Sequence, residues 1–131
     1  MSDTSAVVLP QICPYAYYHD AAAAIDFLTT AFGFRERLRV TNDDGAITHA
    51  ELEIGSGVVM LGGGMPDGMK NPAELGQVTV GMYVQVADVE AHYRQAKAAG
   101  ATLQGEPKDQ TYGVRSYGAL DGEGHQWWFW S

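Results

Sequence analysis

The sequence has little cysteine and little positive charge. Cys13 is the only cysteine of the 131 residues, which excludes an internal disulfide and a cysteine-based zinc site. Eight Lys and Arg stand against 16 Asp and Glu, so the formal net charge is −8. No basic cluster can neutralise phosphates, which argues against nucleic acid and anionic membranes as partners.

The sequence also has no long apolar run. The first residues, MSDTSAVVLPQ, carry no basic stretch followed by an apolar one. We therefore expect neither a signal peptide nor a transmembrane segment, and the protein is expected in the cytoplasm. A chain of this length fits one domain, residues 1–131, with a substantial core.

Two segments have the features of amphipathic helices. Asp20 can cap a helix formed by DAAAAIDFLTTAFG, and Asp88 can cap one formed by VEAHYRQAKAAG. Gly33 and Gly100 follow where a left-handed residue ends a helix. The sequence predicts helices near residues 20–32 and 88–99.

Strand-like segments surround each helix in the same order. LPQICPYAYY precedes the first helix, and FRERLRV, AITHAELEI and VVMLGGG follow it. QVTVGMYVQV precedes the second, followed by a segment at about 101–106, GVRSYGAL and HQWWFW. Strand, cap, helix and glycine recur with an offset of 68 residues. The pattern predicts an α+β fold of two tandem βαβββ modules, at about 8–64 and 77–131, joined by a linker at 65–76.

This duplicated pattern resembles the vicinal oxygen chelate superfamily of glyoxalases, bleomycin resistance proteins and extradiol dioxygenases. The resemblance is carried by YYHDAAAAIDFLTTAFGF, VQVADVEAHYRQAKAAGA and YGVRSYGALDGEGHQWWFW, and covers nearly the whole chain. It implies curled mixed sheets around a cavity, helices on the outside, and a homodimer that completes the cavity.

The resemblance also implies positions for a divalent metal. Four ligand positions of metal-dependent members fall on Cys13, on or near Glu51, on Gly81 and on Trp128. Glycine has no ligand atom and indole binds no metal, so we expect no metal ligands and no cofactor. The chain is therefore most similar to metal-free, bleomycin-resistance-like members, with a divalent metal at another place as the alternative.

Strand alternation predicts which side chains face the cavity. With Trp128 inward, Trp127 is expected to be buried between sheet and helix. The expected ligand-binding residues are Tyr15, Tyr17, Glu53, Tyr83, Arg115, Tyr117, Trp128 and Trp130. An ordinary solvated sheet face alternates in the same way, but so many large rings left in water form an unusual apolar patch. Such rings suit a planar or aromatic ligand.

The segment His49-Ala-Glu51-Leu-Glu53 places an imidazole and two carboxylates on one side of a strand. His49 and Glu51 are the candidate catalytic residues, because a neighbouring carboxylate orients a histidine and raises its basicity. The alternative is an exposed strand with ordinary charges. Arg115 is predicted either to clamp a ligand carboxylate or to pair with Glu51 or Glu53. The other histidines, His19, His92 and His125, are interpreted as structural or exposed.

Three functions stay open at this level. The first is metal-free binding or sequestration of a small, partly aromatic compound, for which Glu51 and Glu53 would favour a cation. The second is a glyoxalase-like lyase, isomerase or dioxygenase with a divalent metal, for example at His49 and Glu51. The third is a metal-free acid–base enzyme that works through His49. Whether the protein is an enzyme is left undecided by these patterns.

Overall fold

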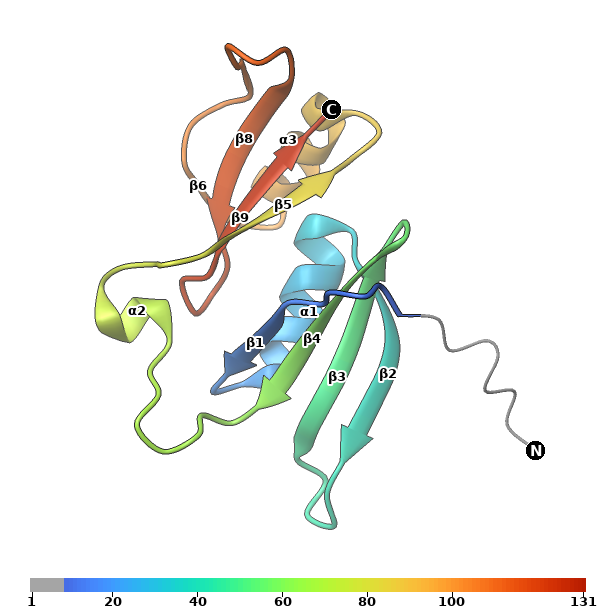
Figure 1. The fold of residues 1–131 in the computed structure, drawn as a ribbon, viewed down its shortest axis with the longest axis vertical. Coiled ribbons are helices and arrows are strands. Elements are labelled where there is room, and N and C mark those ends of the chain that lie inside the picture. Colours follow the sequence, from blue (N-terminus) through green and yellow to red (C-terminus); the bar gives the residue numbers. More distant parts are fainter. Residues whose placement is uncertain (1–8) are drawn as a thin grey trace, which may run out of the picture.

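The computed structural model describes residues 9–131 in two sheets, one from each half of the chain (Figure 1). The first sheet has the strand order β1-β4-β3-β2, with β1 parallel to β4 and the other pairs antiparallel. Its elements are β1 (Tyr15–Tyr18), α1 (Ala21–Phe32), β2 (Arg35–Thr41), β3 (Ile47–Ile54) and β4 (Gly57–Gly63).

The second sheet repeats this arrangement in the order β5-β9-β8-β6, and the short β7 also pairs with β8. Its elements are β5 (Gly81–Gln85), α3 (Val89–Ala98), β6 (Thr102–Leu103), β7 (Lys108–Asp109), β8 (Arg115–Leu120) and β9 (Gln126–Trp130). The predicted α+β fold with two βαβββ modules is confirmed. The strand expected at about 101–106 is present but short, as β6, and β7 is a second two-residue strand beyond that range.

Both main helices begin and end where the sequence predicts. The Asp20 carboxylate accepts a hydrogen bond from the Ala23 amide at 3.0 Å, and Gly33 ends α1 with a positive φ of 80°. The Asp88 carboxylate accepts from two amides of the first turn of α3. These local caps fix the helix boundaries without help from the rest of the fold.

The linker holds a short helix that the sequence analysis did not predict, α2 (Pro72–Leu75). Asn71 and Glu74 form a reciprocal capping box, and Pro72 stands at the first helical position. The sequence predicted only a linker at 65–76. The asparagine followed three residues later by glutamate was the signal that could have identified the helix.

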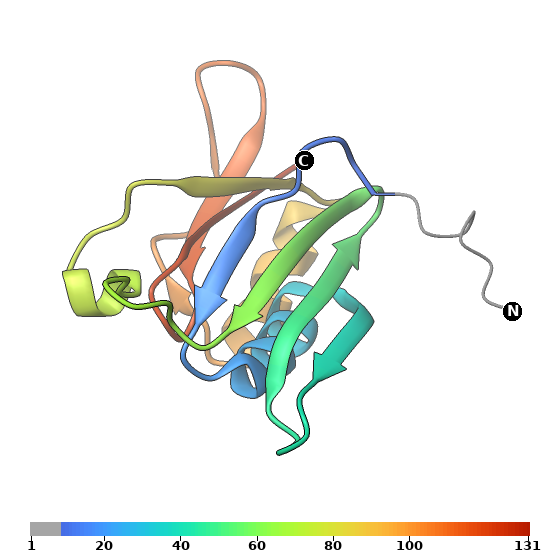
Figure 2. The same cartoon turned by 60° about the horizontal axis from the view of Figure 1, so that its bottom comes forward.

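One hydrophobic core contains side chains from both modules. The main helices α1 and α3 lie on the same side of the two sheets (Figure 2). α1 and α3 contact each other, and Trp127 from the last strand packs on two rings of the first module. The ring centroids of Trp127 and Phe34 lie 5.4 Å apart, and those of Phe32 and Phe129 lie 4.7 Å apart. The opposite faces of both sheets are thereby left outside this core.

The turn between β8 and β9 fastens the second module to the first. The buried Asp121 carboxylate accepts hydrogen bonds from the Tyr18 hydroxyl at 2.6 Å and from Trp127 Nε1 at 3.0 Å. Glu123 accepts from the backbone amides of His19 and Asp20 at the start of α1. The relative position of the two sheets is therefore set by specific polar contacts as well as by the core.

None of the helices within residues 9–131 is long and apolar enough to cross a membrane. The first eight residues, MSDTSAVV, lie outside the described residues. They include most of the segment in which no signal peptide is expected, and residue 8, at which the first module is expected to begin.

Candidate functional site

On the first sheet, the predicted site residues of β1 and β3 share the face opposite the core. Tyr15 and Tyr17 lie on this face with their ring centroids 5.0 Å apart, whereas the intervening Ala16 is buried in the core. On β3, His49 and Glu51 alternate with the buried Ala50 in the same way. The face assignment made from the strand pattern agrees with the structure for these residues.

A hydrogen-bonded chain connects the two strands. The Tyr15 hydroxyl lies 3.0 Å from Nδ1 of His49, and Nε2 of His49 lies 3.1 Å from Oε2 of Glu51. Glu51 is 7% exposed, and the Nε atom of Arg37 lies 3.5 Å from its other oxygen. The ordered chain therefore leads from a half-exposed phenol to a buried carboxylate.

Partial burial, and then the neighbouring Tyr17, raise the pKa of Tyr15 above its ordinary value. The phenol is therefore protonated at neutral pH.

Gly62 allows Tyr15 to reach His49. β4 lies between β1 and β3, and Gly62 is the partner of His49 in the register. A methyl group at position 62 would lie 2.7 Å from Cδ1 of Tyr17 and 2.9 Å from Cε1 of Tyr15. Because glycine leaves this space free, the two tyrosine rings lie across β4.

The carboxylates of this face are neutralised by arginines of β2. Glu51 pairs with Arg37, and Glu53 accepts hydrogen bonds from the Arg35 guanidinium, whose Nε atom lies 3.0 Å away. Arg115 bonds instead to Glu90 of α3 and to Asp109, at 3.1 Å in the second case. The prediction that Arg115 pairs with Glu51 or Glu53 is wrong, because Arg115 lies on the helix side of the other sheet.

The prediction that Tyr117 faces the cavity is also wrong, because its side chain is buried in the core. Tyr117 stands opposite Phe129 in the register, so the β8 residues on the face opposite the core are Ser116 and Gly118. The Tyr117 hydroxyl lies 2.6 Å from Nδ1 of His92, and burial raises the pKa of Tyr117 far above its ordinary value. The segment RSYGAL has no clear apolar alternation, so its sequence does not indicate which face is buried.

His92 is a buried structural histidine that joins the modules. Its Nε2 donates to the Phe32 carbonyl oxygen at 2.7 Å, so Nδ1 of the neutral ring accepts from Tyr117. Burial lowers the pKa of His92 below its ordinary value. His19 is exposed and pairs with Glu74 at 2.7 Å, and His125 lies 3.2 Å from the Tyr17 carbonyl oxygen.

On the second sheet, Trp128 lies across the neighbouring strands. Its indole lies above glycine on both sides, because a methyl group at Gly81 would be 3.2 Å from Nε1 and one at Gly118 would be 2.7 Å from Cζ3. Tyr83 stacks on Trp128 with a centroid distance of 6.1 Å and an interplanar angle of 29°. Trp130 is on the same face as Trp128 and is partly exposed. Trp127 is 1% exposed, as predicted.

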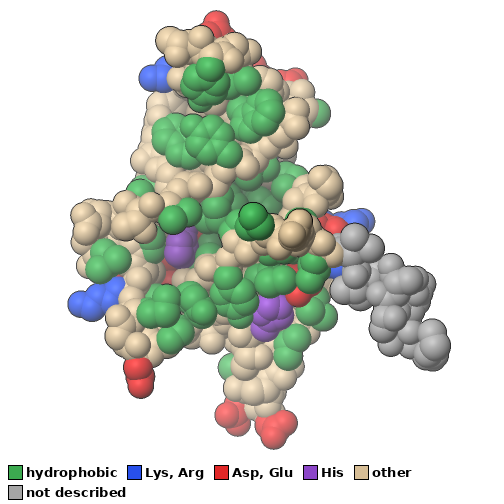
Figure 3. Space-filling view, in the orientation of Figure 1, with side chains coloured by type: hydrophobic (Ala, Val, Ile, Leu, Met, Phe, Trp, Pro, Cys, Tyr) green, Lys and Arg blue, Asp and Glu red, His purple; other side chains and the backbone are tan. Residues whose placement is uncertain are grey.

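Hollows border both aromatic faces. One of about 210 Å³ lies over Trp128 and is lined by Tyr83, Gln104, Glu106, Lys108 and the unpredicted Tyr112, among others. Another of about 340 Å³ adjoins Tyr15 and Tyr17 and is walled by the linker. Hydrophobic side chains gather on this side of both modules, with histidines exposed among them (Figure 3).

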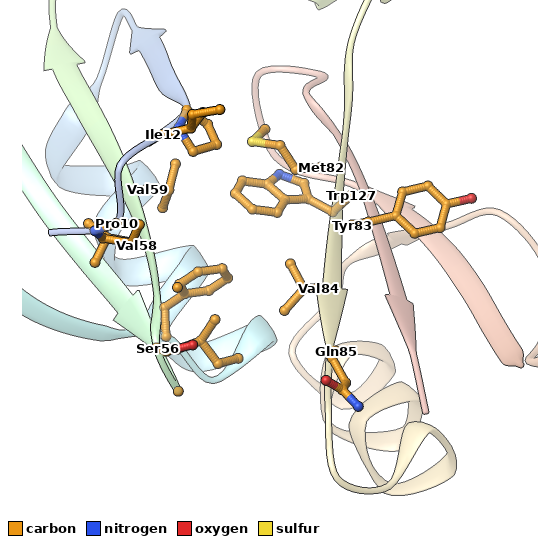
Figure 4. Close-up of a pocket in the computed structure, with 15 residues that line it drawn as sticks. Pro10, Ile12, Ser56, Val58, Val59, Met82, Tyr83, Val84, Gln85 and Trp127 are labelled. Atoms are coloured by element: carbon orange, nitrogen blue, oxygen red, sulfur yellow. The ribbon is translucent and has the colours of Figure 1, made fainter.

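An apolar cleft between the modules, of about 550 Å³, was not predicted. Val59 comes from the first module, and Met82, Val84 and Trp127 from the second (Figure 4). The Tyr83 ring points away from the first module in this view, consistent with its alternation against Met82. The cleft therefore lies mainly on the core side of β5, and it shares Pro14 and Met82 with the hollow beside Tyr15.

The four positions that the resemblance assigns to metal ligands do not fit a metal. The Cys13 thiol bonds to the Pro10 carbonyl oxygen at 3.4 Å, and Glu51 is engaged by His49 and Arg37. The Trp128 indole fills the space above Gly81. Among residues 9–131, no three His, Cys, Asp or Glu side chains come together in a group that could hold a metal ion.

Comparison of the strand registers of the two modules locates the second metal-ligand position, which was predicted on or near Glu51. Tyr15 stands opposite Met60 as Tyr83 stands opposite Trp128, and both pairs are offset by 68 residues. The first-module equivalent of Trp128 is thus Met60 on β4, while Glu51 lies beside it on β3.

Comparisons with known proteins agree with this architecture. The chain is 39% identical over 130 residues to an uncharacterized protein of Mycobacterium tuberculosis strain H37Rv, covering 95% of this chain and 76% of that protein. The crystal structure of TioX from Micromonospora sp. ML1 is 34% identical, with a TM-score of 0.75, over 92% of this chain and 97% of TioX.

A second solved structure is similar in fold. A superfamily member from Sphaerobacter thermophilus DSM 20745 is 17% identical with a TM-score of 0.67, over 92% of this chain and 97% of that one. The sequence pattern of the Glyoxalase/Bleomycin resistance protein/Dioxygenase superfamily matches residues 10–129. The chain therefore belongs to the Glyoxalase/Bleomycin resistance protein/Dioxygenase superfamily.

Proposed function

We propose that this protein binds a small, partly aromatic molecule on its exposed aromatic faces, without a metal ion. The observation that carries the proposal is the position of Trp128, whose indole lies across two strands because Gly81 and Gly118 leave room for it. A large ring held flat on a sheet offers a rigid stacking surface at little entropic cost.

The surroundings of Trp128 support a ligand site more than a chance apolar patch. Tyr83 and Tyr112, 59% and 62% exposed, line the hollow over the indole, and the hydrogen bond that Tyr112 makes to Tyr83 raises the pKa of Tyr112. The rim is polar, with Gln104, Lys108 and other hydrogen-bonding side chains. Aromatic rings for stacking, with hydrogen-bonding side chains around them, suit a ligand that has both a ring and polar groups.

The charge of the first sheet gives no preference for a cation. Glu51 and Glu53 each face an arginine, so the acidic lining expected from the sequence is compensated. We therefore propose a neutral planar compound as the ligand class and drop the cationic preference.

We further propose that two copies of the chain form a homodimer, as the family resemblance implies. The hollow over Trp128, about 210 Å³, is smaller than the roughly 300–1,000 Å³ of ligand pockets. A second copy would supply the missing wall over the exposed tyrosines. Sedimentation velocity at micromolar concentration is expected to give a dimer, and a monomer at that concentration contradicts this proposal.

The binding proposal is tested with a panel of planar neutral compounds, including naphthalene, quinoline and indole derivatives. Their binding is followed by ligand-observed saturation-transfer NMR, which does not depend on the protein's own tryptophan fluorescence. Trp128→Ala should weaken binding by roughly 1–3 kcal/mol if the ring is a central contact, and Trp128→Phe by less. Binding that is unchanged in Trp128→Ala, or no binding to wild type, contradicts the proposal.

A second candidate function is a metal-free acid–base enzyme with His49 and Glu51 as its catalytic residues. The contacts from Tyr15 through His49 to Glu51 favour it, because a carboxylate can orient a histidine so that the imidazole acts as a general base. Turnover of a phenolic or enolisable substrate that is lost in His49→Gln and retained in His19→Gln would establish it. A metal-dependent lyase or dioxygenase is not proposed, because the residues at the ligand positions do not fit.

A further inference from the structure

We infer that Tyr15 forms a polar subsite on the first sheet that selects ligand groups able to donate a hydrogen bond, such as a phenol, another hydroxyl or an N–H. The subsite is separate from the stacking surface of Trp128. It rests on the proposed binding function only in requiring that a small molecule reaches this face.

The Glu51 carboxylate, at the buried end of the Tyr15–His49–Glu51 contacts, sets the direction of the hydrogen bonds. An ionised carboxylate only accepts, so the Glu51 oxygen 3.1 Å from Nε2 fixes the proton of the His49 ring on that nitrogen. In the neutral ring, Nδ1 is then an acceptor, and the Tyr15 hydroxyl 3.0 Å away must donate its only proton to it. The Tyr15 oxygen is left with acceptor capacity alone.

The charged groups around His49 keep this direction in place. The Nε atom of Arg37 lies 3.5 Å from the other oxygen of Glu51, while Arg35 engages Glu53, the next carboxylate on the strand. Val40 of β2 and Gly62 of β4 are the register partners of His49, and neither carries a competing hydrogen-bonding side chain. The Glu51 carboxylate is thus the acceptor of the Nε2 proton.

The subsite is open to a ligand. Tyr15 is 43% exposed, and its ring lies beside that of Tyr17 on the face of the first sheet opposite the core. On the linker side of β1, the same residue borders the hollow of about 340 Å³. The other walls of this hollow are mostly apolar, with Tyr17, Met69 and Val80 among them. A compound with an apolar body and one donor group at its edge has both parts of its chemistry matched, whereas an ether or a ring nitrogen would meet only acceptor lone pairs.

The test uses phenol and anisole, which share the ring and differ in the donor. Protein labelled with ¹⁵N at histidine is titrated with each compound, at a pH at which the ring signals of His49 show a neutral imidazole. We expect the Nε2–H tautomer at His49, a shift of its ring nitrogens on adding phenol, and apparent affinity for phenol roughly fivefold higher than for anisole. The Nδ1–H tautomer, equal affinities, or no response of His49 to phenol overturns the inference.

Three variants separate the subsite from its surroundings. Tyr15→Phe should abolish the difference between phenol and anisole, and Tyr17→Phe, with the same loss of a hydroxyl on the same strand, should keep it. Gly62→Ala should also abolish it, because the added methyl group displaces the Tyr15 ring. Far-UV circular dichroism and urea unfolding establish that each variant is folded. A preference for phenol that survives in Tyr15→Phe, or is lost in Tyr17→Phe, contradicts the assignment.

The two proposals fail in different ways. Loss of stacking at Trp128 removes binding of the planar panel and leaves the His49 response to phenol intact. An incorrect assignment at Tyr15 leaves the panel binding intact and removes the response of His49.

Discussion

Trp127 and Trp128 are neighbours in sequence, but their replacement should have different effects. Trp127→Ala should lower the free energy of unfolding, whereas Trp128→Ala should mainly weaken ligand binding. Trp127 is 1% exposed, packs against Phe34 and Phe32, and donates its Nε1 proton to Asp121. Trp127→Ala removes this packing, which typically costs about 3–5 kcal/mol for a buried aromatic ring. The lost hydrogen bond to a charged group adds on the order of 1 kcal/mol, since Asp121 keeps its other three donors.

This cost is a large share of the total stability of a domain, which is about 5–15 kcal/mol. Trp128→Ala removes a ring on the open face and leaves the core intact, so it should cost less. The assay is urea unfolding followed by far-UV circular dichroism, which does not use the tryptophan signal that both substitutions change.

Two controls sharpen the comparison. Trp127→Phe keeps a ring in the core and loses the N–H, so its midpoint should lie between wild type and Trp127→Ala. The slope of the unfolding free energy against urea should be the same for all variants, because they expose similar surface on unfolding. Equal midpoints for Trp127→Ala and Trp128→Ala would refute the assignment of the two rings to opposite faces.

Other predictions concern polar and glycine positions. The native pKa of His92 is lowered by burial, so the folded state binds fewer protons than the unfolded one, and stability falls as pH drops below about 6.5. His92→Gln should flatten the dependence of the unfolding free energy on pH, measured by urea unfolding between pH 5 and 7. Both proteins should carry His19→Gln, because pairing with Glu74 raises the pKa of His19 and gives a pH dependence of the opposite sign. A pH dependence that His92→Gln leaves unchanged contradicts the role of His92. Gly118→Ala should cost about 1–3 kcal/mol in thermal unfolding, since its methyl group meets the indole at 2.7 Å, whereas Gly122→Ala has open space and should be near neutral. Asp121→Ala should cost at least about 3 kcal/mol by leaving several donors without their charged acceptor, and a loss below 1 kcal/mol by the same measurement rejects its role as a tie between the modules.

Local signals were sufficient for the helices and for most of the alternation. The aspartate caps and glycine stops fix α1 and α3 because each acts within one turn of the chain. The alternation of Trp127 with Trp128 follows from the strand geometry alone. The duplicated order of these elements was enough to identify the superfamily.

Local signals failed where polarity was ambiguous. Alternation gives two faces but not which one is buried. In β8 the small Gly118 lies on the face opposite the core, where the Trp128 indole fills the space above it. The phase of Arg115 and Tyr117 was therefore inverted. The short helix α2 was missed because turn formers on both sides hid its capping box.

The contacts that make the candidate site come from residues far apart in the sequence, and only the tertiary structure could decide them. Tyr15 and His49 meet across 34 residues because Gly62 opens a path over β4, and Tyr18 meets Asp121 across 103 residues. The sequence determined the scaffold, the two helices and the residue types available for a site, because these depend on neighbours along the chain. Which charges are compensated, which rings stack and which hydroxyl lies on the open face depend on the pairing of strands, and this pairing exists only in the folded chain.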